Sequence, residues 1–172
     1  HRVAELASIS RWASDYLGRH PTLLDELLRQ ESPHPVPDWN ALHDELVYQL
    51  NHVNNPKDDV IESQMDVLCN FQHAQVFRLL VTDLEGKLLL ETLSDHLTAL
   101  ADLMLDTVLN LAWSGLKRRH RAEPAFAIIG YGKLGGKELG YASDLDLIFL
   151  YEDDHPDAAE IYTKLGQSIN AW

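Results

Sequence analysis

The sequence contains a single cysteine, Cys69, among its 172 residues. One thiol cannot build a disulfide framework within the chain, so we expect a reducing compartment and predict a cytoplasmic protein. The sequence also lacks a signal peptide and any apolar run of the roughly 18–20 residues that a membrane span requires. We therefore expect no membrane partner. Because Cys69 lies in the apolar helical stretch VLCNF, we predict a buried structural thiol rather than a reactive one.

Basic residues are scarce in this chain. The 14 Lys and Arg residues face 27 Asp and Glu residues, which gives a formal net charge of −13. Such a surface repels a phosphate backbone, so we predict no nucleic-acid partner. A nucleotide is not excluded, because backbone N–H groups, a metal ion or one lysine can hold its phosphates. An initiating methionine is also missing, and we expect the chain to be a piece of a longer protein.

Helical periodicity dominates the first two thirds of the chain, and hydrophobic residues make up 45% of the whole. Apolar residues at three-to-four spacing predict a helix that ends at Gly18 and a second that begins at Pro21. The proline-rich segment 31–38 predicts a linker or a loop. The same spacing predicts further helices over 39–50, 60–80 and 94–118, the last of them capped by Ser94. We predict a helical bundle over residues 1–121.

The pattern changes at Pro124. The apolar runs AFAIIGY (125–131) and DLDLIFLY (144–151) predict strands buried on both faces, and a helix follows Pro156. The predicted fold class is α+β and mainly α, with a second domain over residues 122–172.

The most informative stretch is GYGKLGGKELGYASDLD at 130–146, where a glycine-rich turn precedes two aspartates. If a strand begins at Asp144, Asp144 and Asp146 share one face, and the leucines at 145 and 147 point into the core. Two ionised carboxylates on one face require a compensating cation, and hard oxygen ligands favour Mg²⁺. A glycine turn lets backbone N–H groups approach a phosphate. This combination predicts phosphoryl or nucleotidyl transfer.

Two other phosphate motifs fit this stretch poorly. A P-loop ends in Gly-Lys-Ser/Thr, whereas Leu134 follows Gly132-Lys133 here. Gly130, Gly132 and Gly135 spell GxGxxG, but the next strand follows too soon for the crossover helix of a dinucleotide-binding unit.

The spacing from Gly132 to the Asp144-Leu145-Asp146 triplet resembles the signature of the DNA polymerase β-like nucleotidyltransferase superfamily. The full string GYGKLGGKELGYASDLDLIF resembles bacterial glutamine synthetase adenylyltransferases, and so do RHPTLLDELL, FQHAQVFRLLVTDLEGKL and SDHLTALADLMLDTVLNLAW. The resemblance covers nearly the whole chain. It implies the start of a polymerase β-like nucleotidyltransferase domain after the helical bundle, truncated at residue 172.

This resemblance implies a bifunctional enzyme that transfers AMP from ATP to a tyrosine of glutamine synthetase by two-metal chemistry and also removes it. The sequence of the motif is more similar to the adenylylating domain of this family than to the adenylyl-removing one. The resemblance implies ATP as substrate and Mg²⁺ as cofactor. The residues that it singles out are the metal-binding and catalytic Asp144 and Asp146, together with Gly135, Gly136, Ser143 and Lys133 at the phosphates. Ser143 could contact a phosphate or cap the turn, and Lys137 could add charge.

The chain departs from the superfamily pattern in one respect, because a third carboxylate on a later strand is missing. The acidic residues after the second strand lie in a loop and a helix instead: Glu152, Asp153, Asp154, Asp157 and Glu160. We therefore expect at most weak ATP binding, and no turnover, by this chain alone.

A non-catalytic docking module with a degenerate nucleotide pocket is the alternative to an enzyme part. The bundle could be scaffold, or it could dock glutamine synthetase or a PII signalling protein. The basic run 117–121 is either a solvated helix end or a contact for an acidic partner or RNA.

Overall fold

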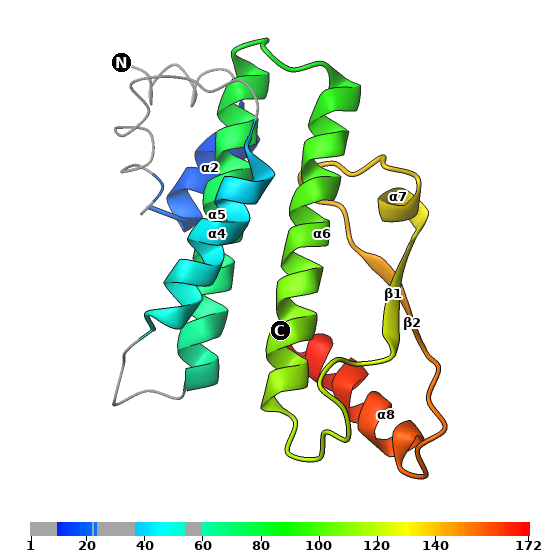
Figure 1. Cartoon of the computed structure of the whole chain (residues 1–172). Helices are drawn as coiled ribbons and strands as arrows, with labels where there is room; N and C mark the ends of the chain where they lie inside the picture. The colour runs from blue at the N-terminus through cyan, green and yellow to red at the C-terminus, as the bar shows by residue number, and fades with distance from the viewer. Residues whose placement is uncertain (1–9, 22, 24–36, 54–59) are drawn as a thin grey trace. The chain divides into compact units, whose positions relative to one another are not determined.

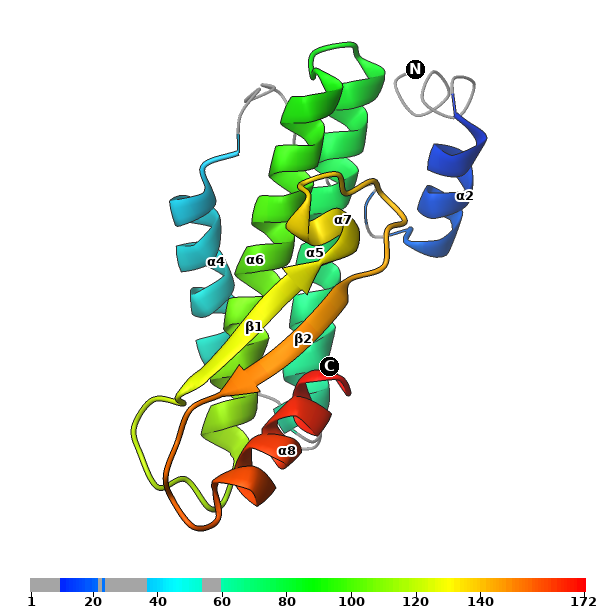
Figure 2. The ribbon, with the colours of Figure 1, turned by 90° about the vertical axis from the view of Figure 1, so that its right-hand side faces the viewer.

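The computed structural model describes residues 10–21, 23, 37–53 and 60–172, and it divides the chain into two compact units, His1–Leu100 and Ala101–Trp172. The helices and strands appear in Figures 1 and 2. In chain order they are α2 (Arg11–Arg19), α4 (Trp39–Asn51), α5 (Val60–Leu84), α6 (Leu90–Gly115), β1 (Phe126–Tyr131), α7 (Gly132–Gly135), β2 (Asp146–Tyr151) and α8 (Ala158–Ile169). The mainly helical α+β fold is confirmed. The domain boundary between residues 121 and 122 stays a prediction.

The first unit contains α2, α4, α5 and the first part of α6. Apolar side chains that recur on these helices are buried, and Leu46, Phe77 and Val81 are at most 1% exposed. Asp38 caps α4 by accepting hydrogen bonds from two backbone N–H groups, as Asp residues at this position commonly do. His96 at the start of α6 is also buried, and burial lowers its pKa below the usual value. The bundle interior therefore holds this histidine in its neutral form at pH 7.

Several sequence predictions for the helices need correction. Gly18 does not end the first helix, because α2 continues to Arg19 and His20 caps it. The helix predicted from Ser94 begins one turn earlier, at Leu90. Cys69 is exposed, because it lies on a face of α5 that no described residue covers. The helix from Pro21 and the linker 31–38 lie mostly outside the described residues.

The second unit is built on an antiparallel hairpin. β1 pairs with β2 so that Phe126 lies opposite Tyr151 and Tyr131 lies opposite Asp146. Aromatic rings pack on one face of the hairpin: Tyr162 of α8 stacks on Tyr151 at 4.9 Å, on Phe126 at 5.9 Å and on Trp113 of α6 at 5.8 Å between ring centroids. Tyr162 is 2% exposed and forms the centre of this core.

The other face of the hairpin is open, so the prediction of strands buried on both faces is wrong for the described chain. Exposed and partly buried residues alternate along β1, as expected for a sheet with one covered face. The exposed face carries three cross-strand pairs, which are Ala127 with Leu150, Ile129 with Ile148, and Tyr131 with Asp146. Ile129, Ile148 and Leu150 are 42%, 48% and 53% exposed.

Candidate functional site

Asp146 begins β2 on the open face of the hairpin, directly opposite Tyr131. Its carboxylate lies against the backbone of Gly132, the first residue of α7. A Cβ atom on Gly132 would overlap with Oδ2 of Asp146, and the φ of Gly132 is +54°. Only glycine combines this left-handed conformation with the space that the carboxylate occupies. The glycine turn and Asp146 therefore form one local arrangement.

Asp144 precedes the strand, contrary to the prediction that β2 begins there. β2 begins at Asp146, and residues 143–145 form an irregular connection. Strand alternation therefore fixes the face of Asp146 but not that of Asp144. Leu145, predicted to point into the core, is 40% exposed, whereas Leu147 is partly buried. Both aspartates are exposed, and their metal-binding role stays a prediction.

The predicted glycine turn contains a single helical turn, α7. Gly135 lies close to the preceding strand, since a Cβ atom there would come within 2.6 Å of the Gly130 carbonyl oxygen. Gly136 caps α7 and its N–H donates to the Gly132 carbonyl at 3.0 Å. This donor is therefore engaged within the turn in the described structure. The phosphate contacts of Gly135 and Gly136 stay predictions.

Ser143 lies at the end of the turn, just before the connection that leads into β2. Its Oγ accepts a hydrogen bond from the Gly140 N–H at 2.9 Å, and its own N–H donates to the Gly140 carbonyl at 3.2 Å. The hydroxyl thus caps the turn, one of the two roles considered from the sequence. A phosphate contact of the same hydroxyl is not tested by this geometry.

Two lysines lie in the turn. Lys133 in α7 and Lys137 after it are both exposed. Lys137 has a φ of +54°, which is uncommon for a residue with a side chain. The predicted role of both lysines, which is to counter the negative charge of a triphosphate, stays a prediction.

The acidic residues after β2 do not join the aspartate pair. β2 has six residues, so its ends are about 17 Å apart. Asp153, just beyond the far end, is instead enclosed by hydrogen-bond donors: its Oδ2 accepts from His120 Nε2 at 2.7 Å, Tyr162 Oη at 2.9 Å and Arg121 Nη1 at 3.1 Å. The Asp153 side chain is 8% exposed. It ties together the segment before β1, the loop after β2 and α8.

Sequence reasoning missed this structural role of Asp153, because its partners lie up to 33 residues away in the chain. The backbone N–H of His155 donates to Oδ1 of Asp153 at 3.0 Å. This bond and the His120 contact hold the pKa of Asp153 well below its usual range. The carboxylate therefore stays ionised and acts as a structural link.

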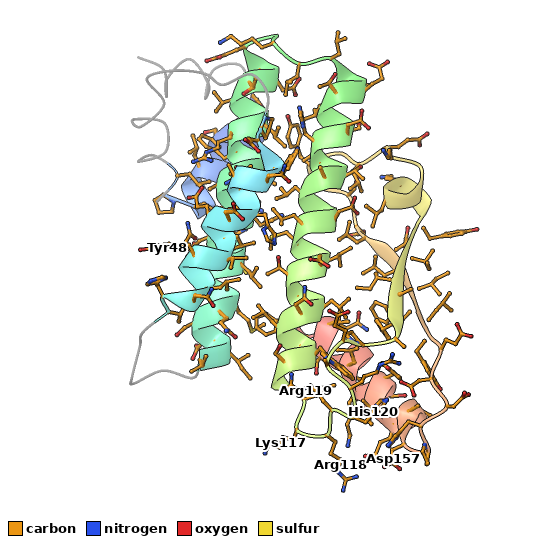
Figure 3. The ribbon with its side chains drawn as sticks, viewed as in Figure 1. Tyr48, Lys117, Arg118, Arg119, His120 and Asp157 are labelled. Carbon is orange, nitrogen blue, oxygen red and sulfur yellow. The ribbon has the colours of Figure 1, made fainter. Side chains whose placement is uncertain are left out.

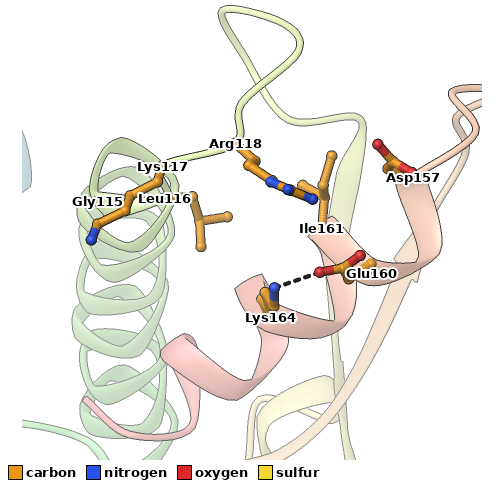
Figure 4. A pocket seen from close by; sticks show the side chains of 8 residues that line it. All are labelled: Gly115, Leu116, Lys117, Arg118, Asp157, Glu160, Ile161 and Lys164. Carbon is orange, nitrogen blue, oxygen red and sulfur yellow. Dashed lines mark hydrogen bonds and ion pairs between the residues drawn. The ribbon is translucent and has the colours of Figure 1, made fainter.

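The residues of the basic run 117–121, which follows α6, differ in their surroundings. His120 and Arg121 contact Asp153, whereas Lys117, Arg118 and Arg119 project from the loop (Figure 3). Arg118 extends towards α8 and lines a pocket of about 360 Å³ (Figure 4). The remaining lining comes from the end of α6 and from α8: Gly115, Leu116, Lys117, Asp157, Glu160, Ile161 and Lys164. None of the predicted site residues lines this pocket.

No helix among the described residues has both the length and the apolar character to span a membrane.

Comparison with known proteins identifies the family. A family model described as glutamate-ammonia ligase adenylyltransferase matches residues 1–172. Proteins named bifunctional glutamine synthetase adenylyltransferase/adenylyl-removing enzyme are similar to this chain: that of Nitrosomonas europaea is 75% identical, that of Nitrosomonas eutropha 72% and that of Aromatoleum aromaticum 56%, each over 171 residues.

These matches cover 99% of the chain but 18% of each relative. The chain thus spans about a fifth of the length of the relatives that it matches. The resemblance inferred from the motif at 130–146 is confirmed, and the chain belongs to the glutamate-ammonia ligase adenylyltransferase family.

Proposed function

We propose that this chain carries the metal-binding part of a nucleotidyl-transfer site, within an enzyme that transfers AMP from ATP to a tyrosine of glutamine synthetase. The observation that carries the proposal is the carboxylate of Asp146, which lies against the left-handed Gly132 at the start of β2. The names of the relatives, which refer to adenylyl transfer and removal on glutamine synthetase, support the protein substrate.

The oxygen donors of the chain fit Mg²⁺. In nucleotide sites this ion is held by one or two carboxylates together with phosphates of the substrate. Asp144 and Asp146 are exposed and two residues apart, so their oxygens are accessible to such an ion. Within the described ranges, no three His, Cys, Asp or Glu side chains gather into a group that could hold a metal.

The chain's own contribution to the reaction is positioning and charge. Bound Mg²⁺ would supply charge neutralisation on the phosphates. Asp144 and Asp146 would hold it, and the exposed Lys133 would add positive charge beside the triphosphate. The tyrosine hydroxyl of glutamine synthetase would lose its proton to water, and its oxygen would attack the α-phosphorus of ATP. The bond to the β-phosphate oxygen breaks, and pyrophosphate leaves as the tyrosyl-AMP bond forms.

We assign the chain to the adenylylating activity rather than the removing one, because the sequence of residues 130–151 resembles the adenylylating domain more closely. A cytoplasmic location and a contact with a PII protein belong to the same proposal. Introducing Asp146→Asn into the enzyme that contains this chain should abolish AMP transfer to glutamine synthetase and leave phosphorolytic removal intact. Loss of removal with transfer retained would reverse the assignment.

The direct test is calorimetric titration of the chain with ATP, with and without Mg²⁺. We expect weak binding that requires Mg²⁺ and is lost in Asp146→Asn. The matched control is Asp66→Asn, which removes the charge of another exposed aspartate, on α5. Binding that persists without Mg²⁺, or that is equal in Asp146→Asn and Asp66→Asn, would contradict the proposed site.

A further inference from the structure

Tyr131 lies on the open face of the hairpin, directly opposite Asp146. It is the last residue of β1 and is 66% exposed. Side chains that face one another across an antiparallel pair have Cβ atoms about 4.5–5.5 Å apart. The aromatic ring of Tyr131 is therefore a near neighbour of the Asp146 carboxylate, on the face that is open to a ligand.

Most of the Tyr131 side chain is exposed, and in the part of the chain that the structure describes it has neither a hydrogen-bond partner nor an aromatic partner. Tyr151 and Tyr162, in the aromatic core of the second unit, differ from Tyr131, because their rings stack on each other with centroids 4.9 Å apart. Even Tyr48 on α4, which is 63% exposed, stacks on His52 with ring centroids 4.0 Å apart. Folding does not account for the large exposed ring at position 131.

The geometry points to Tyr131 as a specificity-determining residue that stacks on the adenine base of ATP. This inference rests on the proposed function, in which Asp146 holds the metal-bound triphosphate. A tyrosine side chain is longer than that of an aspartate, so a triphosphate held at Asp146 would leave the Tyr131 ring free to contact the nucleoside. Stacking of a base on an aromatic side chain contributes about 1–3 kcal/mol by alanine substitution. The neighbouring Ile129 and Ile148 add an apolar floor beside the ring.

The test compares two ligands that share the triphosphate and differ in the base. The chain and its Tyr131→Ala variant are titrated with ATP and with inorganic tripolyphosphate, both in the presence of Mg²⁺. We expect Tyr131→Ala to weaken ATP binding roughly 5- to 150-fold, which follows from the stacking energy. Tripolyphosphate binding should not change. Tyr131→Phe should keep ATP binding, because the ring and not the hydroxyl makes the contact.

Two control variants separate base stacking from general effects of an exposed apolar group. Tyr48→Ala removes a tyrosine of matched exposure in the first unit. Leu150→Ala shortens an exposed side chain on the same sheet face, four residues and about 13 Å from Asp146. Both should bind ATP as the unaltered chain does. Saturation transfer from protein to the adenine ring protons gives a second readout, which should fall in Tyr131→Ala alone.

The outcomes distinguish this inference from the proposed function. Metal-dependent binding of both ligands, with ATP affinity unchanged in Tyr131→Ala, would overturn the role of Tyr131 and leave the metal site standing. An equal loss of ATP and tripolyphosphate binding in Tyr131→Ala would also overturn it, because the ring would then act on the phosphates or on Asp146. If neither ligand binds the unaltered chain, the proposed function and the inference both fail.

Discussion

At the scale of single residues, Gly132 is the position where backbone conformation and site chemistry meet. Its φ of +54° costs a residue with a side chain about 1–2 kcal/mol. A Cβ atom would in addition displace the Asp146 carboxylate. We expect Gly132→Ala to destabilise the chain by more than about 1 kcal/mol and to weaken Mg²⁺-dependent ATP binding. Urea unfolding and calorimetry measure the two effects.

Gly86 is the matched control for this prediction. It has a φ of +69° in the turn after α5, and no atom lies within 4 Å of the place that a Cβ atom would take. Gly86→Ala should therefore lower the free energy of unfolding by about 1 kcal/mol through its backbone conformation alone. Because it displaces no neighbouring atom, it should leave ATP binding unchanged. Equal ATP affinity in the two variants would show that Gly132 does not position Asp146.

The sequence predicted the glycine turn and the acidic pair, but not the contact between Gly132 and Asp146. Four glycines between positions 130 and 136 indicate a turn, because glycine is favoured wherever the backbone must bend sharply. Which of them adopts a positive φ depends on the hairpin register, which brings Tyr131 opposite Asp146. That register is a long-range property, so local spacing could not determine it.

At the scale of secondary-structure elements, Asp153 holds three segments of the second unit together. His120 and Arg121 come from the segment before β1, and Tyr162 comes from α8. Tyr162 also accepts a hydrogen bond from the Ala125 N–H at 3.0 Å, so one hydroxyl links α8 both to Asp153 and to the start of the hairpin. A buried carboxylate with this many donors loses several hydrogen bonds when it is removed or protonated.

Asp153→Asn should lower the melting temperature at pH 7, because the amide cannot accept from all of these donors. The low pKa of Asp153 in the folded chain sets the pH dependence. A group whose pKa is lower when folded contributes stability fully above its unfolded pKa of about 4, and that stability is lost progressively as the pH falls from this value through the lower pKa of the folded chain. The difference between the unaltered chain and Asp153→Asn should therefore narrow from pH 5 to pH 3, measured by thermal unfolding.

The neighbouring Asp154 provides the control for this pH dependence. It is exposed, so Asp154→Asn should leave the melting temperature at pH 7 nearly unchanged. A difference between the unaltered chain and Asp153→Asn that stays constant from pH 5 to pH 3 would contradict the structural role of the ionised carboxylate.

The presence of a helix or strand was easier to predict from the sequence than its first and last residues or which of its faces is exposed. The long helices α5 and α6 follow from apolar spacing, although α6 begins at Leu90 and not at the candidate cap Ser94. Periodicity identifies a helix but not its first turn, because the preceding turn at Gly86 decides where the chain becomes helical again. The strand sequences are apolar on both faces, and an apolar run does not reveal which face is covered. The structure shows one covered face.

At the scale of the whole molecule, strong acidity and an open apolar sheet face occur together. The formal net charge is −13 and the sequence pI is about 4.9. Charge of one sign keeps chains apart at neutral pH, whereas net charge near zero promotes association. The open face of the hairpin presents Ile129, Ile148 and Leu150 side by side. Apolar surface of this kind is a site of self-association once repulsion is removed.

We therefore expect light scattering to rise as the pH is lowered from 7.5 to 5, and we expect Leu150→Lys to reduce that rise. Leu89→Lys makes the same chemical change at another exposed leucine, in the turn before α6, and leaves the sheet face intact. Both variants move the net charge equally towards zero at pH 7.5, so a difference between them reports position and not charge. If the two variants scatter equally at pH 5, the open sheet face is not the surface through which the chains associate.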